Sequence, residues 1–494
     1  MKVVVRTVQH ESALEASPKT SVKEIFNLIC KSLGIQETWY FGLMYYGPDS
    51  EEIWIDQSKK TLKDLRHNST NLHFKVKFYP EDIGEELIEA VTIDFFFLQV
   101  KSAVLKDEIY CPADTCVLLA SYALQAKYGD YNKDEHNEDI LKRHKLLPER
   151  VTKQHALNTS DWHVNITSMW IKHNGLDKEE AMLEYLKLVQ NLEMYGVTYF
   201  NIKNRKGTDV ILGVTALGLN IYKEDDRLNP TVAFPWSEIK NLKFKDKKFI
   251  IKPADKSAKD FIFFTHSGRM SKYILNLGIG NHSLYVRRRK PDTPEVAKMK
   301  EKANEKTIQK LQQQLDELQK SKEELEEQRN ELRNMMQRLE ESKNMESAER
   351  QKLEDEINAK HAEVLRIQEE VERKDAEAKR LQDEEKRRGI EEETRRRGEK
   401  REEEERQRQE EQELETLPEG ADTSLPELQQ VNEQLKEQLK QLQGTLEGSR
   451  HQEEETTLDK IHRINLLEGR DKYKTLADIR RGNTIRRVEM FENM

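Results

Sequence analysis

The spacing of apolar residues changes several times along the chain, and each change marks a predicted segment. Residues 1–82 hold short runs of β-branched and aromatic residues, as expected of strands, around one helical pattern. In that pattern, from Ser21 to Leu33, apolar residues recur every three or four positions, and Gly34 follows as a terminator. Strands around a single helix in this order are typical of a ubiquitin-like fold.

Residues 83–197 carry apolar residues at helical spacing instead. Residues 85–105 predict one continuous helix, and Pro112 lies in the first turn of another. Asp177 and Glu180 form a capping box at the start of the last helix. We therefore predict a compact all-α lobe.

Residues 198–295 return to a period of two, which is typical of half-buried strands. Six runs show it: TYFNIKN, DVILGV, LGLNIYK, VAFPW, FIIK and DFIFF. A final helix is predicted from Ser271 to Arg289. Short antiparallel strands followed by one helix are the order of a pleckstrin-homology or phosphotyrosine-binding fold.

Residues 296–415 are predicted to form an α-helical coiled coil. A heptad register holds over residues 308–381, with two apolar core positions that charged residues interrupt, so we expect a loose seam. One position reads Leu311, Leu318, Leu325, Leu332, Leu339, Leu353, Ile367 and Leu381, and the other reads Ile308, Leu315, Met336, Ile357, Val364, Val371 and Ala378. As one helix, residues 300–415 would be on the order of 170 Å long.

Residues 428–494 form the last segment, after a linker at 416–427 in which Pro418 and Pro426 exclude a continuous helix. An apolar stripe leads into a basic stretch, whose few apolar residues lie three apart where they are close and so share a helix face. These anchors are Leu476, Ile479, Ile485, Val488 and Phe491. The stretch is too small to bury a core of its own, so it needs a partner surface.

The composition divides the chain in the same way. Of 494 residues, 36% are hydrophobic and 35% are charged, and most aromatic and β-branched residues precede residue 290. The net charge of −9 is modest for this length, so bulk attraction to nucleic acid is not expected. Cys30, Cys111 and Cys116 are expected to be reduced core thiols in the cytosol. The N-terminus reads as a strand rather than a signal peptide, and no apolar run approaches the roughly 20 residues of a membrane-spanning helix.

The motifs of common enzyme classes are absent from the sequence. We find no P-loop, HExxH, nucleophile elbow or Cys/His metal cluster, and the glycine-rich GIGNH lies inside a predicted helix. We expect no enzymatic activity, no metal and no cofactor.

Longer runs resemble a known family. FYPEDI, YCPADTCVLLASYALQAKYGD, LEYLKLVQNLEMYGVTYFNIKN, FPWSEIKN and DKKFIIKP resemble the FERM domain in its ezrin-type version, and RDKYKTL, IRRGNT and RRVEMFENM resemble the C-terminal tail of the ezrin, radixin and moesin family. The resemblance implies a multidomain α+β protein. Its three FERM lobes would be ubiquitin-like, all-α like acyl-CoA-binding protein, and pleckstrin-like, followed by a coiled coil that folds back as a hairpin and a helical tail.

The resemblance also implies a function. The family links the plasma membrane to cortical actin filaments, is held closed by docking of the tail on the head, and opens on lipid binding and phosphorylation. We expect a cytoplasmic protein on the inner face of the plasma membrane that binds phosphatidylinositol bisphosphate, receptor tails, F-actin and its own tail. The sequence is compatible both with a resting form that is a monomer and with one that is an antiparallel dimer. One alternative is a merlin-like FERM signalling scaffold without filament binding, and another is a structural coiled-coil dimer with a cargo-binding head.

The family's lipid site maps onto exposed cations of the first and third lobes. The matching residues are Lys59, Lys60, Lys247, Lys248, Lys256 and Lys272. Several ammonium groups on one face can hold a multiply charged head group, although lysines are common on any surface. Asp56 and Ser257 stand where the family commonly has lysine, so a weaker cleft is expected there.

The family's receptor-peptide groove lies between the fifth strand and the helix of the third lobe. It would be lined here by Ile239, Leu242, Phe249, Ile250, Leu275, Ile279 and His282. A free strand edge supplies main-chain hydrogen bonds and an apolar floor supplies specificity. The same residues would also serve as ordinary core.

Thr475 matches the family's regulatory phosphorylation site. With Asp478 it also reads as a helix N-cap, and Gly482 as the stop of that helix. The candidates for the actin contact are the tail cations Arg470, Lys472, Lys474, Arg480, Arg481, Arg486 and Arg487. The alternative for these cations is a solvated helix face.

Overall fold

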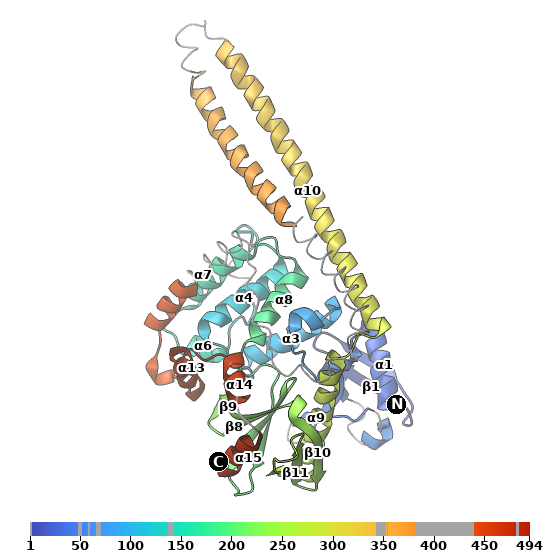
Figure 1. Cartoon of the computed structure of the whole chain (residues 1–494). Coiled ribbons are helices and arrows are strands. Elements are labelled where there is room, and N and C mark those ends of the chain that lie inside the picture. Colours follow the sequence, from blue (N-terminus) through green and yellow to red (C-terminus); the bar gives the residue numbers. More distant parts are fainter. Residues whose placement is uncertain are drawn as a thin grey trace. The chain divides into compact units, whose positions relative to one another are not determined.

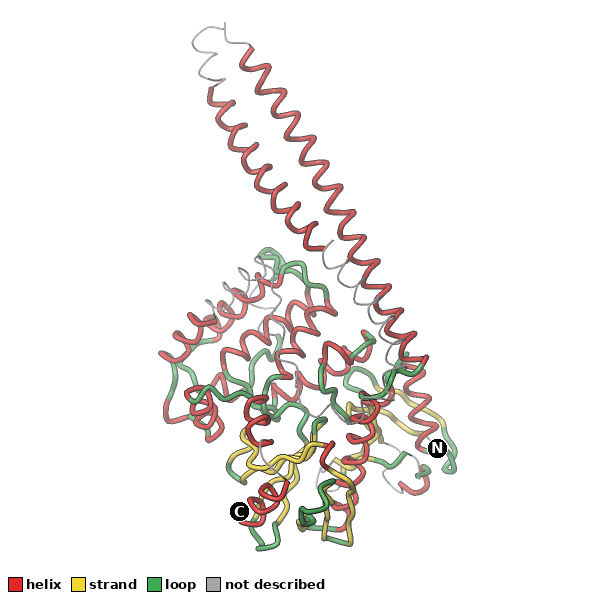
Figure 2. The backbone as a smooth tube through the Cα atoms, viewed as in Figure 1, coloured by secondary structure: helices red, strands yellow, loops and turns green. Residues whose placement is uncertain are grey.

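The structure, a computed structural model, describes residues 2–47, 52–57, 60–65, 71–136, 143–341, 352, 354–381, 439–480 and 484–494. It forms two compact units, residues 1–292 with 424–494 and residues 293–423 (Figures 1 and 2). No helix in the described part of the chain is long and apolar enough to cross a membrane. The multidomain α+β fold predicted from the sequence is confirmed.

Lobe 1 is a mixed sheet with one helix on it. Its elements are β1 (Lys2–Arg6), β2 (Glu11–Glu15), α1 (Val22–Leu33), a 3₁₀ turn (Thr38–Tyr40), β3 (Phe41–Tyr46), β4 (Glu52–Trp54) and β5 (Asn71–Val76). The strand order is β2-β1-β5-β3-β4, with β1 and β5 parallel. Ser21 caps α1 in a capping box with Glu24. Gly34 ends the helix at φ 74°, and this end was predicted from the sequence.

Lobe 2 is helical, with one correction to the prediction. Its elements are α2 (Ile83–Glu86), α3 (Ala90–Leu105), α4 (Ala113–Tyr128), α6 (Glu149–Lys153), α7 (Thr159–Trp170), a 3₁₀ turn (Ile171–His173) and α8 (Lys178–Gln190). The single helix predicted over 85–105 is wrong, because the chain breaks between α2 and α3. The Glu37 carboxylate of lobe 1 accepts hydrogen bonds from the backbone N–H groups of Ile88 (3.2 Å) and Glu89 (2.9 Å), which therefore do not continue a helix.

Lobe 3 is a curved antiparallel sheet closed by a long helix. Its elements are β6 (Thr198–Lys203), β7 (Asp209–Thr215), β8 (Gly218–Lys223), β9 (Asp226–Pro235), a 3₁₀ turn (Trp236–Glu238), β10 (Ile239–Lys245), β11 (Lys248–Pro253), β12 (Phe261–Phe264) and α9 (Gly268–Arg288). The strand order is β10-β11-β12-β6-β7-β8-β9. The six predicted runs omitted β10, whose lysine-rich, mostly exposed residues are those of an edge strand.

The second unit contains two helices that run antiparallel, α10 (Pro294–Glu341) and a helix over residues 354–381. Leu332 packs with Ile367 and Val371, and Lys322 forms an ion pair with Asp375 at 2.5 Å. The predicted heptad residues therefore meet across a hairpin within this unit rather than along one straight helix. The charged stretch after Leu381 and the proline linker lie outside the described residues.

Candidate functional site

The described tail, residues 439–480 and 484–494, packs within the first unit on the head, which is the three lobes of residues 1–292. It contains a helical stretch at 439–448, a 3₁₀ turn (Gln452–Glu454), α13 (Thr457–Leu467), α14 (Lys472–Arg480) and α15 (Thr484–Asn493). The three labelled tail helices all contact β9, the edge strand of lobe 3 opposite to β10 (Figure 1). The tail therefore packs on a partner surface, as its small size requires.

The first part of the tail is joined to lobe 2. Leu442 and Leu446 are buried in the core that lobes 1 and 2 share. The backbone then pairs with lobe 2, because the Ala156 N–H donates to the Ser449 carbonyl (2.7 Å) and the His451 N–H donates to the Gln154 carbonyl (2.8 Å). This contact satisfies main-chain groups and so depends little on side-chain identity.

Asp459 of α13 forms a buried polar cluster with lobe 2. The Tyr110 hydroxyl and Arg150 Nη1 each donate to Asp459 Oδ1 at 2.9 Å, and Gln154 Nε2 donates to Oδ2 at 2.8 Å. The Asp459 side chain is 4% exposed and that of Arg150 is 13% exposed. Burial alone would raise the pKa of Asp459, but hydrogen bonds from Thr456 and the Arg150 charge hold this pKa below its usual value. The carboxylate therefore stays charged in the docked tail.

The other end of α13 is joined to β9. Asn465 and Asn229 exchange two amide hydrogen bonds of 3.0 Å, and Asn465 is 3% exposed. A reciprocal amide pair needs both side chains in register, so it fixes where α13 lies along β9.

Lys472 begins α14 and points into the junction of the lobes. Its Nζ donates to the carbonyl oxygens of Gln190 (2.8 Å), Leu192 (3.1 Å) and Tyr195 (3.4 Å), and lies 5.2 Å from the centre of the Tyr195 ring. Burial lowers the pKa of Lys472 to about 7, although the Glu193 carboxylate acts in the opposite direction. Lys472 is thus occupied by the head when the tail is docked.

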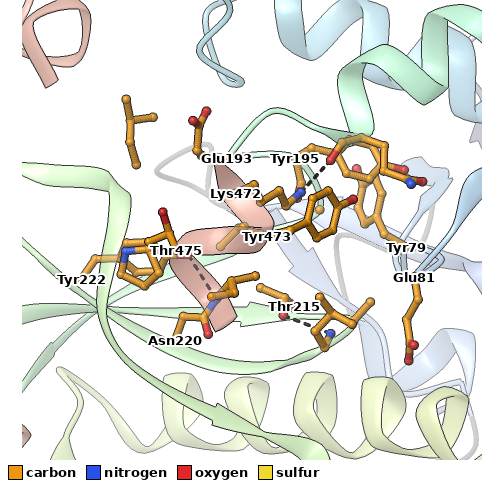
Figure 3. Close-up of a pocket in the computed structure, with 18 of the residues that line it drawn as sticks. Tyr79, Glu81, Glu193, Tyr195, Thr215, Asn220, Tyr222, Lys472, Tyr473 and Thr475 are labelled. Atoms are coloured by element: carbon orange, nitrogen blue, oxygen red, sulfur yellow. Dashed lines mark hydrogen bonds between the residues drawn. The ribbon is translucent and has the colours of Figure 1, made fainter. Parts of the chain in front are cut away.

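Thr475 lies half-buried beside Lys472 and lines a small cavity (Figure 3). The cavity measures about 50 Å³ and is lined by residues of all three lobes and of α14. That volume is far below the several hundred Å³ of pockets for small organic ligands. We therefore regard it as residual space in a protein–protein contact.

The prediction that Thr475 caps a helix is wrong. Its N–H donates to the Asp471 carbonyl (2.9 Å), and Asp471 Oδ1 accepts from the N–H groups of Tyr473 and Lys474 at 2.9 and 2.8 Å. Asp471 therefore caps α14, and Thr475 lies inside it. The predicted stop at Gly482 lies outside the described residues.

Helix α15 closes the core of lobe 3. Phe491 is fully buried, with its ring centre 3.9 Å from that of Phe261, and Val488 is 2% exposed in the same core. Arg487 is 3% exposed and forms an ion pair with Glu238, which also accepts a 3.0 Å hydrogen bond from the Thr484 hydroxyl. Of the predicted anchors, Leu476, Val488 and Phe491 are buried, and Ile479 and Ile485 are half-buried.

The predicted actin-binding cations fall into two groups in the docked tail. Lys472 and Arg487 face the head, and Arg480 is half-buried beside Arg487. The exposed cations are Arg470, Lys474 and Arg486. Arg481 lies outside the described residues.

The predicted lipid-site lysines that are described, Lys60, Lys247, Lys248, Lys256 and Lys272, are all exposed, and Lys59 lies outside the described residues. Lys247 and Lys248 lie at the turn between β10 and β11. The Thr265 N–H donates to the Lys247 carbonyl (2.8 Å), and the Thr265 and Ser271 hydroxyls are 2.7 Å apart. These bonds hold the turn near the start of α9, where Lys272 lies, so these lysines share one end of lobe 3.

The predicted groove residues border β10 and α9, which pack together at the sheet edge. Ile279 is 51% exposed, and Leu242, Ile250, Leu275 and His282 are half-buried. Ile239 is buried, and Phe249 is fully buried in the lobe 3 core, so Phe249 cannot contact a peptide in this structure.

Sequence reasoning missed the polar docking residues, namely Asp459, Asn465, Arg150, Asn229 and Glu238. One signal was available, since Thr456 and Asp459 match a capping box, which the structure forms. Nothing in the local pattern indicated their partners, which lie hundreds of positions away.

Comparison with known proteins gave matches over most of the chain. The matching family models are the FERM N-terminal domain (residues 5–67), the FERM central domain (82–200), the FERM C-terminal PH-like domain (204–293), the ezrin/radixin/moesin alpha-helical domain (293–388) and the ezrin/radixin/moesin family C terminal (418–494).

Similar individual proteins include two curated relatives named moesin/ezrin/radixin homolog 1, from Culex quinquefasciatus and Aedes aegypti. Both are 50% identical over 321 residues, which is 65% of this chain and 56% and 55% of theirs, so the matched stretch spans about half of each relative. A solved complex of the FERM and C-terminal domains of Drosophila Merlin matches with a TM-score of 0.57 and 40% identity, over 59% of this chain and 98% of that one.

Proposed function

The chain belongs to the ezrin/radixin/moesin family, and from this we infer that it is a regulated linker between the plasma membrane and cortical actin filaments. The observation that carries the proposal is the docked tail, in which the head occupies Lys472 and Arg487, two of the cations assigned to the filament. Filament binding and docking would therefore compete for the same side chains. The closed chain would be the inactive form. The protein would be cytoplasmic and would bind at the inner face of the plasma membrane.

Release would act through Thr475. A phosphate there adds about −1.5 to −2 charges and three oxygens to a half-buried position. The adjoining cavity has little free volume, and its lining includes Glu81 and Glu193. A phosphorylated α14 would therefore fit its site poorly, and the equilibrium would shift toward the open chain by the difference in affinity.

We expect Thr475→Glu to lower the apparent Kd of the full-length protein for actin filaments tenfold or more, which corresponds to about 1.4 kcal/mol. The measurement is co-sedimentation of the full chain with filaments, with and without phosphoinositide vesicles. Thr475→Val, which keeps the shape of threonine, should pellet like the wild type. If no variant pellets while vesicle binding persists, the linker function fails, and the merlin-like scaffold takes its place.

The membrane contact would use the lysines at the β10–β11 turn, which are exposed on the docked head. We expect a double change of Lys247 and Lys248 to glutamine to weaken binding to phosphatidylinositol bisphosphate vesicles about thirtyfold, because each lysine near an anionic surface contributes about 1 kcal/mol. The matched control changes Lys153 and Lys178, two exposed lysines of lobe 2. Equal losses for both pairs would indicate attraction by overall charge rather than a site.

The receptor contact would use the free edge of β10. An extended receptor peptide would add to this edge through main-chain hydrogen bonds, and its side chains would contact the exposed Ile279 and the half-buried Leu242. The scaffold alternative keeps these head contacts and differs in the tail. The similarity to the merlin complex supports tail docking for either function, so filament binding is the discriminating measurement.

A further inference from the structure

Thr484 begins α15 and follows a pair of arginines in the sequence RRGNT, with Arg480 four and Arg481 three positions before it. Paired cations at a fixed distance before a hydroxyl are the kind of charge pattern that an acidic substrate groove of a kinase selects. We propose that Thr484 is a second phosphorylation site, modified only in the open chain, and that its phosphate prevents the tail from docking again. This inference rests on the proposed function, in which the tail opens.

The docked structure protects Thr484 from modification. The residue is 7% exposed, and its hydroxyl donates to Glu238 Oε2 at 3.0 Å and lies 3.2 Å from Arg487 Nη2. A kinase needs the acceptor in an extended, accessible segment, which α15 offers only after it leaves lobe 3. Modification at Thr484 would therefore follow opening and could not cause it.

The step itself is an ordinary phosphoryl transfer from ATP. The Thr484 hydroxyl oxygen forms a bond to the γ-phosphorus of ATP, the bond between that phosphorus and the β,γ-bridging oxygen breaks, and ADP leaves. The hydroxyl proton passes to the catalytic base of the kinase.

A phosphate on Thr484 opposes docking in two ways. It replaces a hydroxyl donor with an anion against the Glu238 carboxylate, which turns a hydrogen bond into a repulsion. It also competes with Glu238 for Arg487, because arginine and phosphate form strong paired hydrogen bonds. The Nε atoms of Arg480 and Arg487 have no hydrogen-bond partner among the described residues, so donors are available on the tail itself.

Thr484 is the first residue of α15, so a phosphate there also lies at the N-terminus of this helix, where a negative charge is favourable. Because the helix is present in the docked tail, this effect does not itself favour release. The modification therefore penalises docking through Glu238 and Arg487.

The first test maps phosphorylation on the full chain. Wild type, Thr475→Glu and Phe491→Ala are incubated with ATP and a kinase that selects arginine three residues before its acceptor, and phosphate on Thr484 is quantified by mass spectrometry. We expect the opened variants to be modified at least tenfold faster than the wild type. Absence of the modification from every opened chain, or equal rates in all chains, would overturn the proposal.

This design separates the two inferences. If Phe491→Ala is modified at Thr484 while Thr475→Glu remains closed, the switch at Thr475 fails and the site at Thr484 stands. Neither readout involves actin, so failure of filament binding does not decide the result.

The second test asks whether the charge at position 484 acts through Glu238. In the full chain, Thr484→Glu should raise the hydrogen-exchange rates of α15 amides at least tenfold. Adding Glu238→Gln should lower these rates again, because it removes the repulsion and leaves the carboxylate at position 484 to pair with Arg487, which lies 3.2 Å from the Thr484 hydroxyl. Thr484→Val, which only removes the hydroxyl, should raise the exchange rates less than Thr484→Glu does. Adding Glu238→Gln to Thr484→Val should not lower them. If Glu238→Gln lowers the exchange rates of neither variant, or lowers those of both by the same factor, Thr484 has a packing role only.

Discussion

Replacing Asp459 with alanine should release α13 from lobe 2. The change leaves Arg150, whose side chain is 13% exposed, without one of its two carboxylate partners. It also removes the acceptor of the Tyr110 hydroxyl and one of the two acceptors of Gln154 Nε2. Removal of one partner from a buried ion pair costs about 3 kcal/mol or more. In hydrogen exchange of the full chain, amides of α13 should therefore lose roughly a hundredfold of protection.

Two further variants make this result specific. Asp459→Asn keeps the shape and one acceptor but removes the charge, so the difference between asparagine and alanine reports the contribution of the ion pair. Glu468→Ala removes an acid that is 47% exposed at the end of the same helix, and it should change protection by less than about 0.5 kcal/mol. Unchanged protection of α13 in Asp459→Ala would show that main-chain pairing and the leucines hold the tail without the buried cluster.

Phe491→Ala should detach α15 while the head stays folded. The side chain is fully buried in the lobe 3 core, and removal of a buried phenylalanine costs about 3–5 kcal/mol. Because Phe491 comes from the tail, the chain can avoid part of this cost by undocking α15. Exchange of α15 amides should thus rise more than a hundredfold, with little change in the thermal unfolding of the head.

The neighbouring residue provides the control. Met490 is 42% exposed on the same helix, so Met490→Ala should leave α15 protected. Protection of α13 in Phe491→Ala is informative as well, because α13 has its own contacts with lobe 2 and with β9. If α13 loses as much protection as α15, the tail opens as one cooperative unit; if α13 keeps its protection, the two ends open separately.

The sequence predicted those parts of the site that depend on local periodicity. Leu476, Val488 and Phe491 were identified because their spacing puts them on one helix face, and the docked helices bury them. The cap of α14 could not be assigned in this way, because Thr475 and Asp471 both have side chains that can cap a helix. Only the structure shows that the Asp471 carboxylate accepts hydrogen bonds from the N–H groups of Tyr473 and Lys474.

The polar half of the site could not be predicted in the same way. Arg487 and Lys472 were assigned to a solvated or filament-binding face because charged residues on an amphipathic helix usually face water. Their burial is decided by Glu238 and by the carbonyl groups of residues 190–195, which lie more than two hundred positions earlier. The break before α3 has the same origin, because Glu37 imposes it from another lobe.

The location of the charges has a consequence for ionic strength. The pairs that hold the tail, Asp459 with Arg150 and Arg487 with Glu238, are largely withdrawn from solvent, whereas the lysines assigned to the membrane are exposed. At physiological salt, mobile ions largely screen the interaction between exposed charges that lie more than about 8 Å apart. They screen buried ion pairs much less. A higher salt concentration should consequently dissociate the protein from anionic bilayers while the tail stays docked on the head. A high-salt wash of a membrane fraction would therefore recover the closed form.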